Sequence, residues 1–196
     1  LLGGLGCELG GSHYLKVLHG RKEGRPPRLD LELAVSSNEG VLAFIRSGII
    51  KSAHDCSEGG LAVALAECCI SGPDHMPAEI DFGLTDLRPD ELLFNESQSR
   101  FVLTTAPENA DALVSCLTEA GLPARHIGSV ATGRDLRIAA DGRRWAWPLD
   151  ALHDDPGAYG RLDVLAQRLA DGLREAASEA GVTLTVVQSG STLTPF

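Results

Sequence analysis

With 196 residues, 43% of them hydrophobic, the chain is long enough to bury one sizeable core, which excludes wholesale disorder. Its formal net charge of −10 at pH 7 argues against binding to nucleic acid or to an anionic membrane surface, because both repel an acidic protein. A small anionic ligand is not excluded, since a local nest of backbone N–H groups binds phosphate even within an acidic protein.

Cysteine use and hydropathy indicate a cytoplasmic protein. The five cysteines are odd in number and show no metal-ligand spacing, as expected for a reduced cytosolic chain. Cys68 and Cys69 fall within an apolar helical pattern and are predicted to be core residues. No hydrophobic run approaches the roughly 18 residues that a membrane-spanning helix needs. The chain starts at Leu1 without a methionine, so we expect it to be part of a longer protein.

Residues 1–27 are rich in glycine and predict an irregular segment that holds a short helix or strand over 14–18. Two consecutive prolines end this segment, because proline continues neither a helix nor a central strand. A helix is predicted over 38–46, with Gly48 as its left-handed cap. The residues of this helix that should face inward are Val41, Leu42 and Ile45.

The segment 49–54 is a short apolar run and predicts a buried strand. A helix over 58–70 follows, and its apolar residues recur at the spacing of one helix face. These residues are Leu61, Ala64, Leu65, Cys68 and Cys69. Residues 78–82 alternate between apolar and polar side chains and predict a second strand.

Three more strands are predicted over 100–105, 127–130 and 136–139, and a hairpin-like turn joins the last two. Before that hairpin, Pro107 opens a helix at the favoured first position and Gly121 closes it. This order of elements predicts an α/β sandwich with a mixed sheet and flanking helices, rather than a doubly wound parallel sheet.

The sequence pattern changes after residue 148. Residues 154–157 form a turn and helix-capping pattern, and a long amphipathic helix is predicted from there to about residue 180. A strand is predicted over 182–187. We therefore place one domain at 1–150 and an appended helix–strand unit at 151–196.

One polar motif lies where a predicted strand leads into a predicted helix, His54-Asp55-Cys56-Ser57-Glu58-Gly59-Gly60. Glycines let a backbone approach a ligand closely, and a helix start offers free N–H groups and a positive dipole end. Gly59 and Gly60 are therefore predicted to bind a nucleotide, and Asp55 to bind Mg²⁺. The alternative is that Asp55 or Ser57 caps the helix and that the glycines serve packing alone. A catalytic pair of the adjacent histidine and aspartate is not predicted, because neighbours on a strand point to opposite faces.

A second polar motif, Asn95-Glu96-Ser97-Gln98-Ser99-Arg100, precedes a predicted strand. It combines a carboxylate, a hydroxyl, an amide and a guanidinium group, which can hydrogen-bond a sugar, an amide or a phosphate. Glu96, Ser97 and Gln98 are therefore predicted to bind substrate or nucleotide. The alternative is a solvated loop with an Asx or Ser turn. A third candidate is the segment Gly10, Gly11 and Ser12, as a phosphate nest.

Three segments, 9–15, 52–67 and 93–102, contain these motifs and occur in a characteristic order and separation. Together they resemble the last domain of the small, bacterial-type phosphoribosylformylglycinamidine synthases, over residues 1–150. The resemblance implies the carboxy-terminal half of the fold related to aminoimidazole ribonucleotide (AIR) synthase.

The resemblance also implies an ATP-dependent ligase of purine biosynthesis. The family converts formylglycinamide ribonucleotide, ATP and glutamine-derived ammonia into the amidine, ADP and phosphate, and it needs Mg²⁺. It implies that this domain works in the cytoplasm with amino-terminal domains of its own chain, a glutaminase subunit and a small accessory subunit. The family's catalytic histidine and main ATP-binding residues lie in domains absent here. We therefore expect no catalytic residue in this chain and no activity from it alone.

Within the family this type of domain occurs twice. In the first copy, the Glu-Ser-Gln loop contacts the ribonucleotide and an aspartate before the glycines binds Mg²⁺. The matching positions here are Glu96, Ser97, Gln98 and Asp55. The turn in this chain has the form of the second copy, whose site is structural or holds an auxiliary nucleotide. Two roles follow: a domain that lends part of a nucleotide site, or a structural or allosteric module.

The tail resembles a different family. Residues 154–196 are similar to part of the carboxy-terminal domain of glutamate-1-semialdehyde aminotransferase, without its cofactor lysine. A fusion, an engineered chimera or a misjoined reading frame would each explain this, and a chimera without native function is a third interpretation. Absence of the amino-terminal partner domains would expose apolar surface, so self-association to a homo-oligomer is a further hypothesis.

Overall fold

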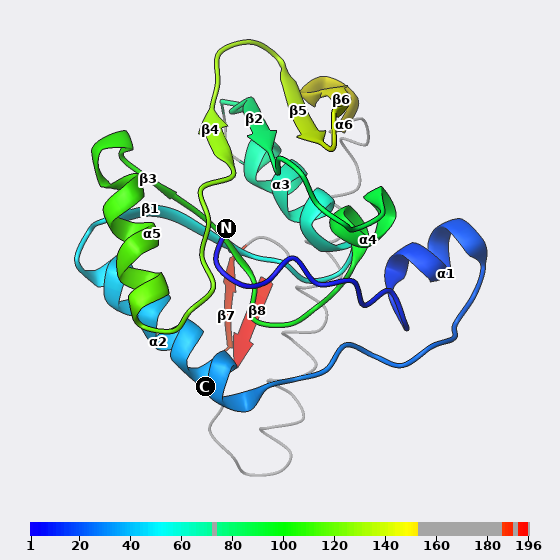
Figure 1. Cartoon of the computed structure of the whole chain (residues 1–196), viewed down its shortest axis with the longest axis horizontal. Helices are drawn as coiled ribbons and strands as arrows, with labels where there is room; N and C mark the ends of the chain where they lie inside the picture. Colours follow the sequence, from blue (N-terminus) through cyan, green and yellow to red (C-terminus); the bar gives the residue numbers. More distant parts are fainter. Residues whose placement is uncertain (72–73, 153–185, 190–191, 196) are drawn as a thin grey trace. The chain divides into compact units, whose positions relative to one another are not determined.

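The computed structural model describes residues 1–71, 74–152, 186–189 and 192–195 (Figure 1). The chain divides into two compact units, Leu1–Leu152 and His153–Phe196. In the second unit, β7 (Val186–Ser189) pairs antiparallel with β8 (Thr192–Pro195), a strand that the sequence did not predict. The predicted long helix, and the beginning of the strand predicted over 182–187, lie outside the described residues.

Two helices come first in the chain. α1 (His13–His19) is the helical one of the two predicted alternatives, and the Ser12 hydroxyl caps it by accepting a hydrogen bond from the Leu15 N–H group. α2 (Leu31–Arg46) begins well before the predicted residue 38, because the Asp30 carboxylate accepts from the Leu33 N–H group and so caps an earlier turn.

The buried face of α2 is narrower than predicted. Val41 is buried, but Leu42 and Ile45, which were also expected to face inward, are each 44% exposed. Within α2 the buried residues are Ser37 and Val41, one helical turn apart. The helix thus contacts the core along a single line, and Leu42 lies about 100° around the helix from that line.

A two-stranded antiparallel sheet joins β1 (Ile50–Asp55) to β3 (Phe101–Thr105). The sequence predicts a buried strand at β1, yet Ile50 is its one buried residue. A single antiparallel pair packs only one face on the helices, so the other side chains of β1 stay exposed or half-buried.

The four-stranded sheet has the order β4-β2-β5-β6 and is mixed, which confirms the predicted sheet type. β2 (Ala78–Asp81) is parallel to β5 (Asp135–Ala140) and antiparallel to β4 (Gly128–Val130). The predicted hairpin between β4 and β5 is wrong, because β2 lies between them.

The hairpin of this sheet instead joins β5 to β6 (Arg143–Pro148). Its turn consists of Asp141 and Gly142, whose φ angles are both positive, at 50° and 73°. An Asp-Gly pair suits this conformation, because two-residue turns that match the twist of a hairpin need positive φ angles. The turn chemistry therefore places the reversal one strand later than the Thr-Gly-Arg-Asp segment that the sequence suggested.

The remaining helices of the first unit are α3 (Gly60–Ile70), α4 (Pro89–Phe94), α5 (Ala110–Glu119), which the 3₁₀ turn η1 (Pro107–Asn109) precedes, and α6 (Leu149–Leu152). The sequence did not predict α4, although Pro89 at its first position is a start signal, and so is Glu91, whose carboxylate accepts from the Arg88 N–H group. Pro107 opens η1 rather than α5 itself, so the predicted helix begins with a tighter turn.

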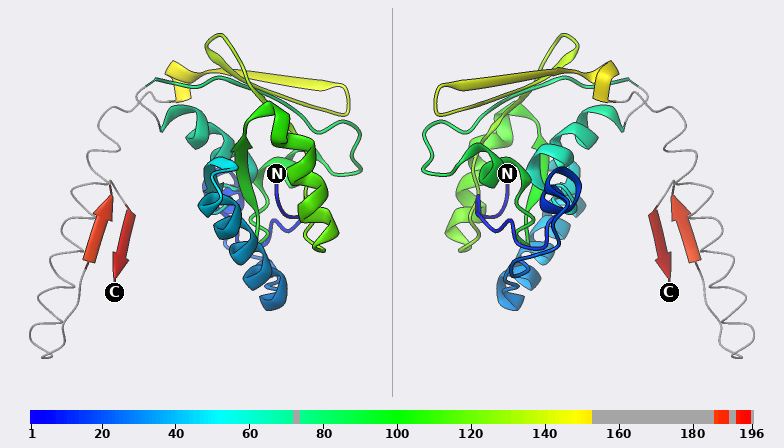
Figure 2. Two further views of the ribbon diagram at one scale, coloured as in Figure 1. Left: turned by 90° about the vertical axis from the view of Figure 1, so that its left-hand side faces the viewer. Right: turned by 90° about the vertical axis from the view of Figure 1, so that its right-hand side faces the viewer.

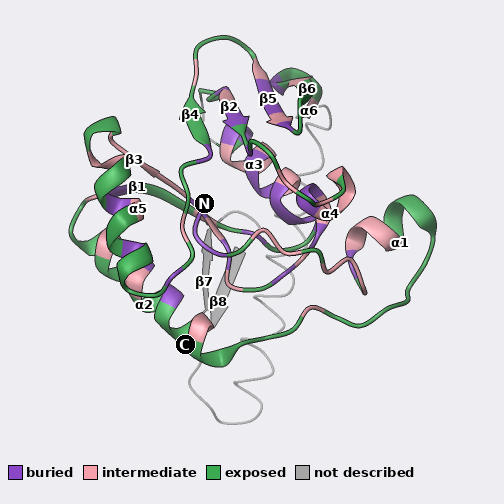
Figure 3. Cartoon of the chain, in the orientation of Figure 1, coloured by how far each residue is buried: buried purple, intermediate pink, exposed green. Residues whose placement is uncertain are grey.

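Two apolar clusters hold the first unit together (Figures 2 and 3). The larger one lies between the four-stranded sheet and the helices α3, α4 and α6. Trp145 and Trp147 of β6 pack against it. The smaller one lies between the β1–β3 pair and the helices α2 and α5. Within the described part of the chain, no helix has the length and apolar character to cross a membrane.

Candidate functional site

The first two polar motifs, and the residue that directly follows the third, meet at one carboxylate. Glu96 Oε1 accepts a hydrogen bond from the Gly59 N–H group at 2.8 Å and another from the His13 N–H group at 2.8 Å. Gly59 is the N-cap of α3, and His13 is the first residue of α1. Two helix starts thus point their unsatisfied N–H groups at a single negative charge, which their dipoles favour.

The turn between β1 and α3 relies on glycine backbone rather than on side-chain capping. Gly59 and Gly60 have φ angles of 80° and 69°, and no side chain within the turn caps α3. The predicted alternative, in which Asp55 or Ser57 caps this helix, is therefore wrong. The Ser57 hydroxyl instead donates to the Asp55 carboxylate. Glu96 supplies the cap from a distant part of the chain.

The adjacent histidine does not pair with the aspartate carboxylate. His54 Nδ1 lies 2.7 Å from the backbone carbonyl oxygen of Asp55, and its Nε2 lies 3.4 Å from a carboxylate oxygen of Glu67 on α3. These contacts agree with the expectation that neighbouring strand residues point to opposite faces. His54 thus links β1 to α3 and forms no dyad with Asp55.

Buried polar side chains hold the loop from Asn95 to Arg100 in place. The Asn95 side chain is fully buried and donates to three backbone carbonyl groups, those of Leu5, Glu91 and Leu92. Its Oδ1 accepts from the Ser97 N–H group, which is an Asx turn. The alternative of a solvated loop is thus half right, because the Asx turn exists but is buried.

Arg100 anchors the end of the same loop. Its side chain is only 2% exposed, and its guanidinium donates to the carbonyl oxygens of Ser97, Leu5 and Asn95 at 3.0, 3.2 and 2.5 Å. Burial lowers the pKa of Arg100 below its ordinary value. No carboxylate among the described residues forms an ion pair with it, so its role is to hold backbone carbonyls in place.

The remaining predicted binding residues bond within the chain. The Ser97 hydroxyl donates to Glu8, the Gln98 side chain donates to the Glu96 carbonyl, and the Ser12 hydroxyl donates to the Leu9 carbonyl. Most of the backbone amides predicted to cradle phosphate are likewise bonded. The acceptors are Glu23 O for Gly11, Leu9 O for Ser12, Glu96 for Gly59 and Ser57 O for Gly60.

Gly10 has a packing reason to be glycine. A Cβ at this position would collide with the backbone carbonyl oxygen of Arg25, and a Cβ at Gly24 would lie 2.7 Å from the Gly10 Cα. The two backbones therefore cross at a distance that only glycine permits. This crossing requires glycine at position 10 whether or not the segment binds phosphate.

Asp55 meets the requirements of an Mg²⁺ site as one carboxylate ligand. Asp55 is exposed at the end of β1, and its carboxylate accepts a hydrogen bond from the Ser57 hydroxyl. In the described part of the chain, no group of three or more His, Cys, Asp or Glu side chains is placed to hold a metal ion. Asp55 can thus contribute one carboxylate to an ion whose other ligands are phosphate oxygens and water, which is how Mg²⁺ commonly binds.

Two residues of this site were missed by sequence reasoning. Glu8 accepts from the Ser97 hydroxyl with one carboxylate oxygen and from the Arg28 N–H group with the other. His13 supplies one of the two amides at Glu96, and its ring lies 3.7 Å from Glu58 and 3.8 Å from Glu96. No local pattern signals Glu8, since its partners are distant in sequence. His13 directly follows the Gly-Gly-Ser segment, which was the available signal.

We expect the thiols of the folded chain to fall into two reactivity classes. Burial raises the pKa of Cys56 to about 11 and that of Cys68 to about 12, and it also raises the pKa of Cys69, whereas Cys7 and Cys116 are exposed. A raised pKa lowers the fraction of reactive thiolate at pH 8. Iodoacetamide should therefore label Cys7 and Cys116 well before the other three, as peptide mass spectrometry would measure. Equal labelling rates for Cys56 and Cys7 would contradict this.

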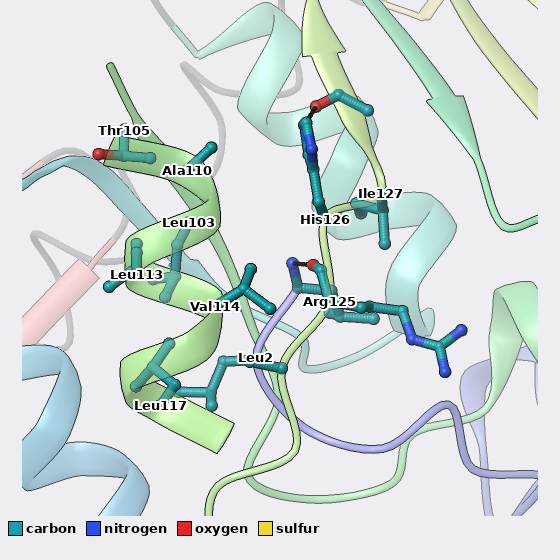
Figure 4. A pocket seen from close by; sticks show the side chains of 13 residues that line it. Leu2, Leu103, Thr105, Ala110, Leu113, Val114, Leu117, Arg125, His126 and Ile127 are labelled. Carbon is teal, nitrogen blue, oxygen red and sulfur yellow. Dashed lines mark hydrogen bonds between the residues drawn. The ribbon is translucent and has the colours of Figure 1, made fainter. Parts of the chain in front are cut away.

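A cavity of about 70 Å³ lies beside β3 and α5 (Figure 4). It is lined mostly by apolar side chains of β3, α5 and the segment 124–128, among them Leu103, Leu113 and Ile127. None of the predicted binding residues lines it. Ligand pockets typically measure about 300–1,000 Å³, so this cavity is too small for a nucleotide and is not the candidate site.

Comparison with known proteins assigns the chain. The profile of the family described as AIR synthase related protein, C-terminal domain, matches residues 1–141. The subunit PurL of phosphoribosylformylglycinamidine synthase from Alkaliphilus metalliredigens is 42% identical over 142 residues, which are 72% of this chain and 19% of that protein. The PurL subunit from Moorella thermoacetica is 45% identical over 143 residues, 73% of this chain and 19% of that protein. The chain thus spans about a fifth of the length of these curated relatives.

A solved structure shows the same fold. Thermotoga maritima PurL in complex with ATP superposes with a TM-score of 0.60 at 20% identity, covering 77% of this chain and 24% of that chain. The expected α/β sandwich and the resemblance of residues 1–150 are both confirmed, whereas the aminotransferase resemblance of the tail stays a prediction. The chain belongs to the AIR synthase-related protein family, and its residues 1–141 correspond to the C-terminal domain of that family.

Proposed function

We propose that residues 1–152 form the last domain of a phosphoribosylformylglycinamidine synthase subunit. The longer protein would carry out the ATP-dependent conversion of formylglycinamide ribonucleotide to formylglycinamidine ribonucleotide. The identity of 42–45% to two curated subunits, over nearly the whole first unit, carries this proposal. The T. maritima relative has been solved with ATP, with ADP and with FGAR, which supports a nucleotide-dependent reaction.

In this proposal the chain is inactive alone, since the catalytic residues implied by the family lie in other domains. Its partners are the amino-terminal domains of the longer protein, a glutaminase subunit and a small accessory subunit, and the enzyme works in the cytoplasm. A T. maritima structure described as PurLQS supports an assembly of several subunits. The tail, residues 153–196, is outside the matched family region and forms a separate appended unit.

The first candidate role for the site is nucleotide binding. Glu96, Ser97, Gln98, Gly59, Gly60, Gly10, Gly11 and Ser12 would contact the ligand, and Asp55 would share Mg²⁺ with its phosphates. This role requires an exchange of bonds, because most of these groups already bond within the chain. Asp55 is exposed, and its carboxylate accepts from Ser57 but keeps lone pairs that an ion can use.

The second candidate role is that of an organising module, and a specific observation favours it. Of the amides predicted to cradle phosphate, those of Gly11, Ser12, Gly59 and Gly60 already have acceptors inside the chain, and the acceptor for Gly59 is the charged Glu96. A carboxylate at two helix starts takes the place that a phosphate would occupy. The site then holds the loop, the turn and α1 together, and contributes to the parent enzyme by its shape.

A domain exchange tests the proposed function. Residues 1–152 would replace the matching last domain of the A. metalliredigens subunit, and ADP release would be measured with formylglycinamide ribonucleotide, ATP and ammonia. We expect activity within about tenfold of the unmodified subunit, since an imperfect domain contact of ~1.4 kcal/mol corresponds to that factor. A chimera that folds with an unchanged melting temperature but lacks activity would overturn the proposal.

The variant Asp55→Ala in the same chimera separates the two roles. If the site binds Mg²⁺ and nucleotide, calorimetric titration should lose a binding event for Mg·ADP and the activity should fall. If the domain only organises the enzyme, both quantities should stay unchanged, because Asp55 lies exposed outside the buried network. The organising role predicts the second result. Asp111→Ala on α5 is a matched control, since it removes an exposed carboxylate away from the site.

A further inference from the structure

Residues 10–28, here called the α1 lobe, form an excursion whose two ends are fastened to each other. The Gly11 N–H group donates to the Glu23 carbonyl at 2.9 Å, and the backbones of Gly10 and Gly24 cross in direct contact. The lobe therefore closes on itself, as Ω-loops do, without help from the rest of the unit. A segment closed in this way can change its position as one body.

The lobe is attached to the rest of the unit by few contacts. No residue of α1 is buried, and Val17 and Leu18 are 70% and 66% exposed (Figure 3). Ser12 is the buried residue of the lobe, and its hydroxyl bonds to the neighbouring Leu9 carbonyl. A segment without buried apolar contacts sits at the low end of the local stability range.

Tyr14 and His13 connect the lobe to the site, and the His13 ring lies 3.7 Å from Glu58 and 3.8 Å from Glu96. The ring of Tyr14 stacks on Phe94 of α4, with 5.1 Å between centroids and 14° between planes. The His13 N–H group donates to Glu96, whose same oxygen also accepts from Gly59 at the start of α3. The root of the lobe is held separately, by the bond from the Arg28 N–H group to Glu8.

We infer that the α1 lobe is a strap, and that Glu96 is the latch that holds it closed against the start of α3. A single oxygen bonds both sides, so the lobe cannot leave without breaking the charge-assisted bond at His13. A ligand group that bonds to the Gly59 N–H or to the Glu96 carboxylate competes with this latch. The inference rests on the contacts of the lobe and holds whichever role the site has in the proposed function.

Limited trypsin digestion of the chain tests the strap. Arg21 and Lys22 lie exposed in the lobe, directly after α1, and cleavage after them is read by peptide mass spectrometry. In Glu96→Ala this cleavage should accelerate by about tenfold, because cleavage follows the population of the open form and one charge-assisted hydrogen bond is lost. Glu96→Gln keeps an acceptor oxygen for both amides and should lie between the variant and the native chain.

Two controls distinguish opening of the lobe from unfolding of the whole unit. Cleavage after Arg137 in the four-stranded sheet should stay unchanged in Glu96→Ala, and Glu119→Ala on α5 should leave every rate unchanged. If Glu96→Ala is cleaved faster at all sites, it has unfolded, and Tyr14→Ala decides instead. That variant removes the stacking from the lobe side without touching a buried residue, and it should accelerate lobe cleavage selectively. If Glu96→Ala is folded, a native rate of lobe cleavage in that variant would overturn the inference. If Glu96→Ala is unfolded, native rates of lobe cleavage in both Tyr14→Ala and Glu96→Gln would overturn it.

Discussion

Replacing Arg100 by methionine should lower the free energy of unfolding of the first unit by about 3–5 kcal/mol. Methionine fills much of the same volume but donates no hydrogen bond. It therefore leaves the carbonyl oxygens of Ser97, Leu5 and Asn95 without their shared donor in a buried position. These carbonyls belong to the loop that carries Glu96 and to the segment beneath it, so the loss also loosens the candidate site.

Urea unfolding followed by tryptophan fluorescence measures this effect. The chain has two tryptophans, Trp145 and Trp147, and both lie on β6 of the first unit, so the signal reports that unit alone. Arg144→Met, at an exposed position of the same strand, is the control and should change stability by less than ~0.5 kcal/mol. A cost below about 1 kcal/mol for Arg100→Met would show that the guanidinium is dispensable.

Replacing Gly60 by alanine should cost about 3–4 kcal/mol, for two reasons that add. The φ angle of 69° is unfavourable for any residue with a Cβ, and the new Cβ would also press against the Asn95 carbonyl oxygen. That oxygen belongs to a buried residue which Arg100 holds in place, so it has little room to yield. The start of α3 and the loop before β3 should therefore separate.

Gly121→Ala is the matched control for Gly60→Ala. Its φ angle is 79°, close to that of Gly60, but no atom lies within 4 Å of the position that a Cβ would occupy. It should therefore cost only the backbone term, about 1–2 kcal/mol. The difference between the two variants, measured by the same urea titration, isolates the close approach of the two backbones. Equal costs would mean that the turn relaxes away from Asn95.

The network that these variants probe satisfies the buried polar groups of the site within the chain. The buried side chains of Asn95 and Arg100 bond to backbone carbonyl groups of the loop and of its neighbours. Glu96 accepts from the amide at the start of α3, and Glu8 bonds both Ser97 and the Arg28 N–H group at the root of the α1 lobe. Polar groups at such density are stable only when each has a partner. Glu96 and Ser97 therefore serve the structure of this unit as a hydrogen-bond acceptor and a hydrogen-bond donor.

Local patterns predicted most elements of the first unit but misplaced several of their contacts. The apolar stripe of α3 is a local property of the sequence, and Leu61, Ala64, Leu65 and Cys69 are buried as predicted. The exposure of Leu42 and Ile45 was not predictable in the same way, because it depends on how narrowly α2 contacts its neighbours. Strand pairing failed for a similar reason, since β2 enters the sheet from an earlier part of the chain.

By itself, the sequence determined the family, the mixed α/β fold and the three motifs that carry polar chemistry, because apolar spacing and motif order are properties of neighbouring residues. Only the tertiary structure decided what the motifs do to one another. Glu96 lies 83 positions from His13 and 37 from Gly59, yet it bonds both through one oxygen. No local rule assigns a carboxylate to amides so far along the chain. Their meeting follows from the packing of β3 against β1 and of α4 against α3.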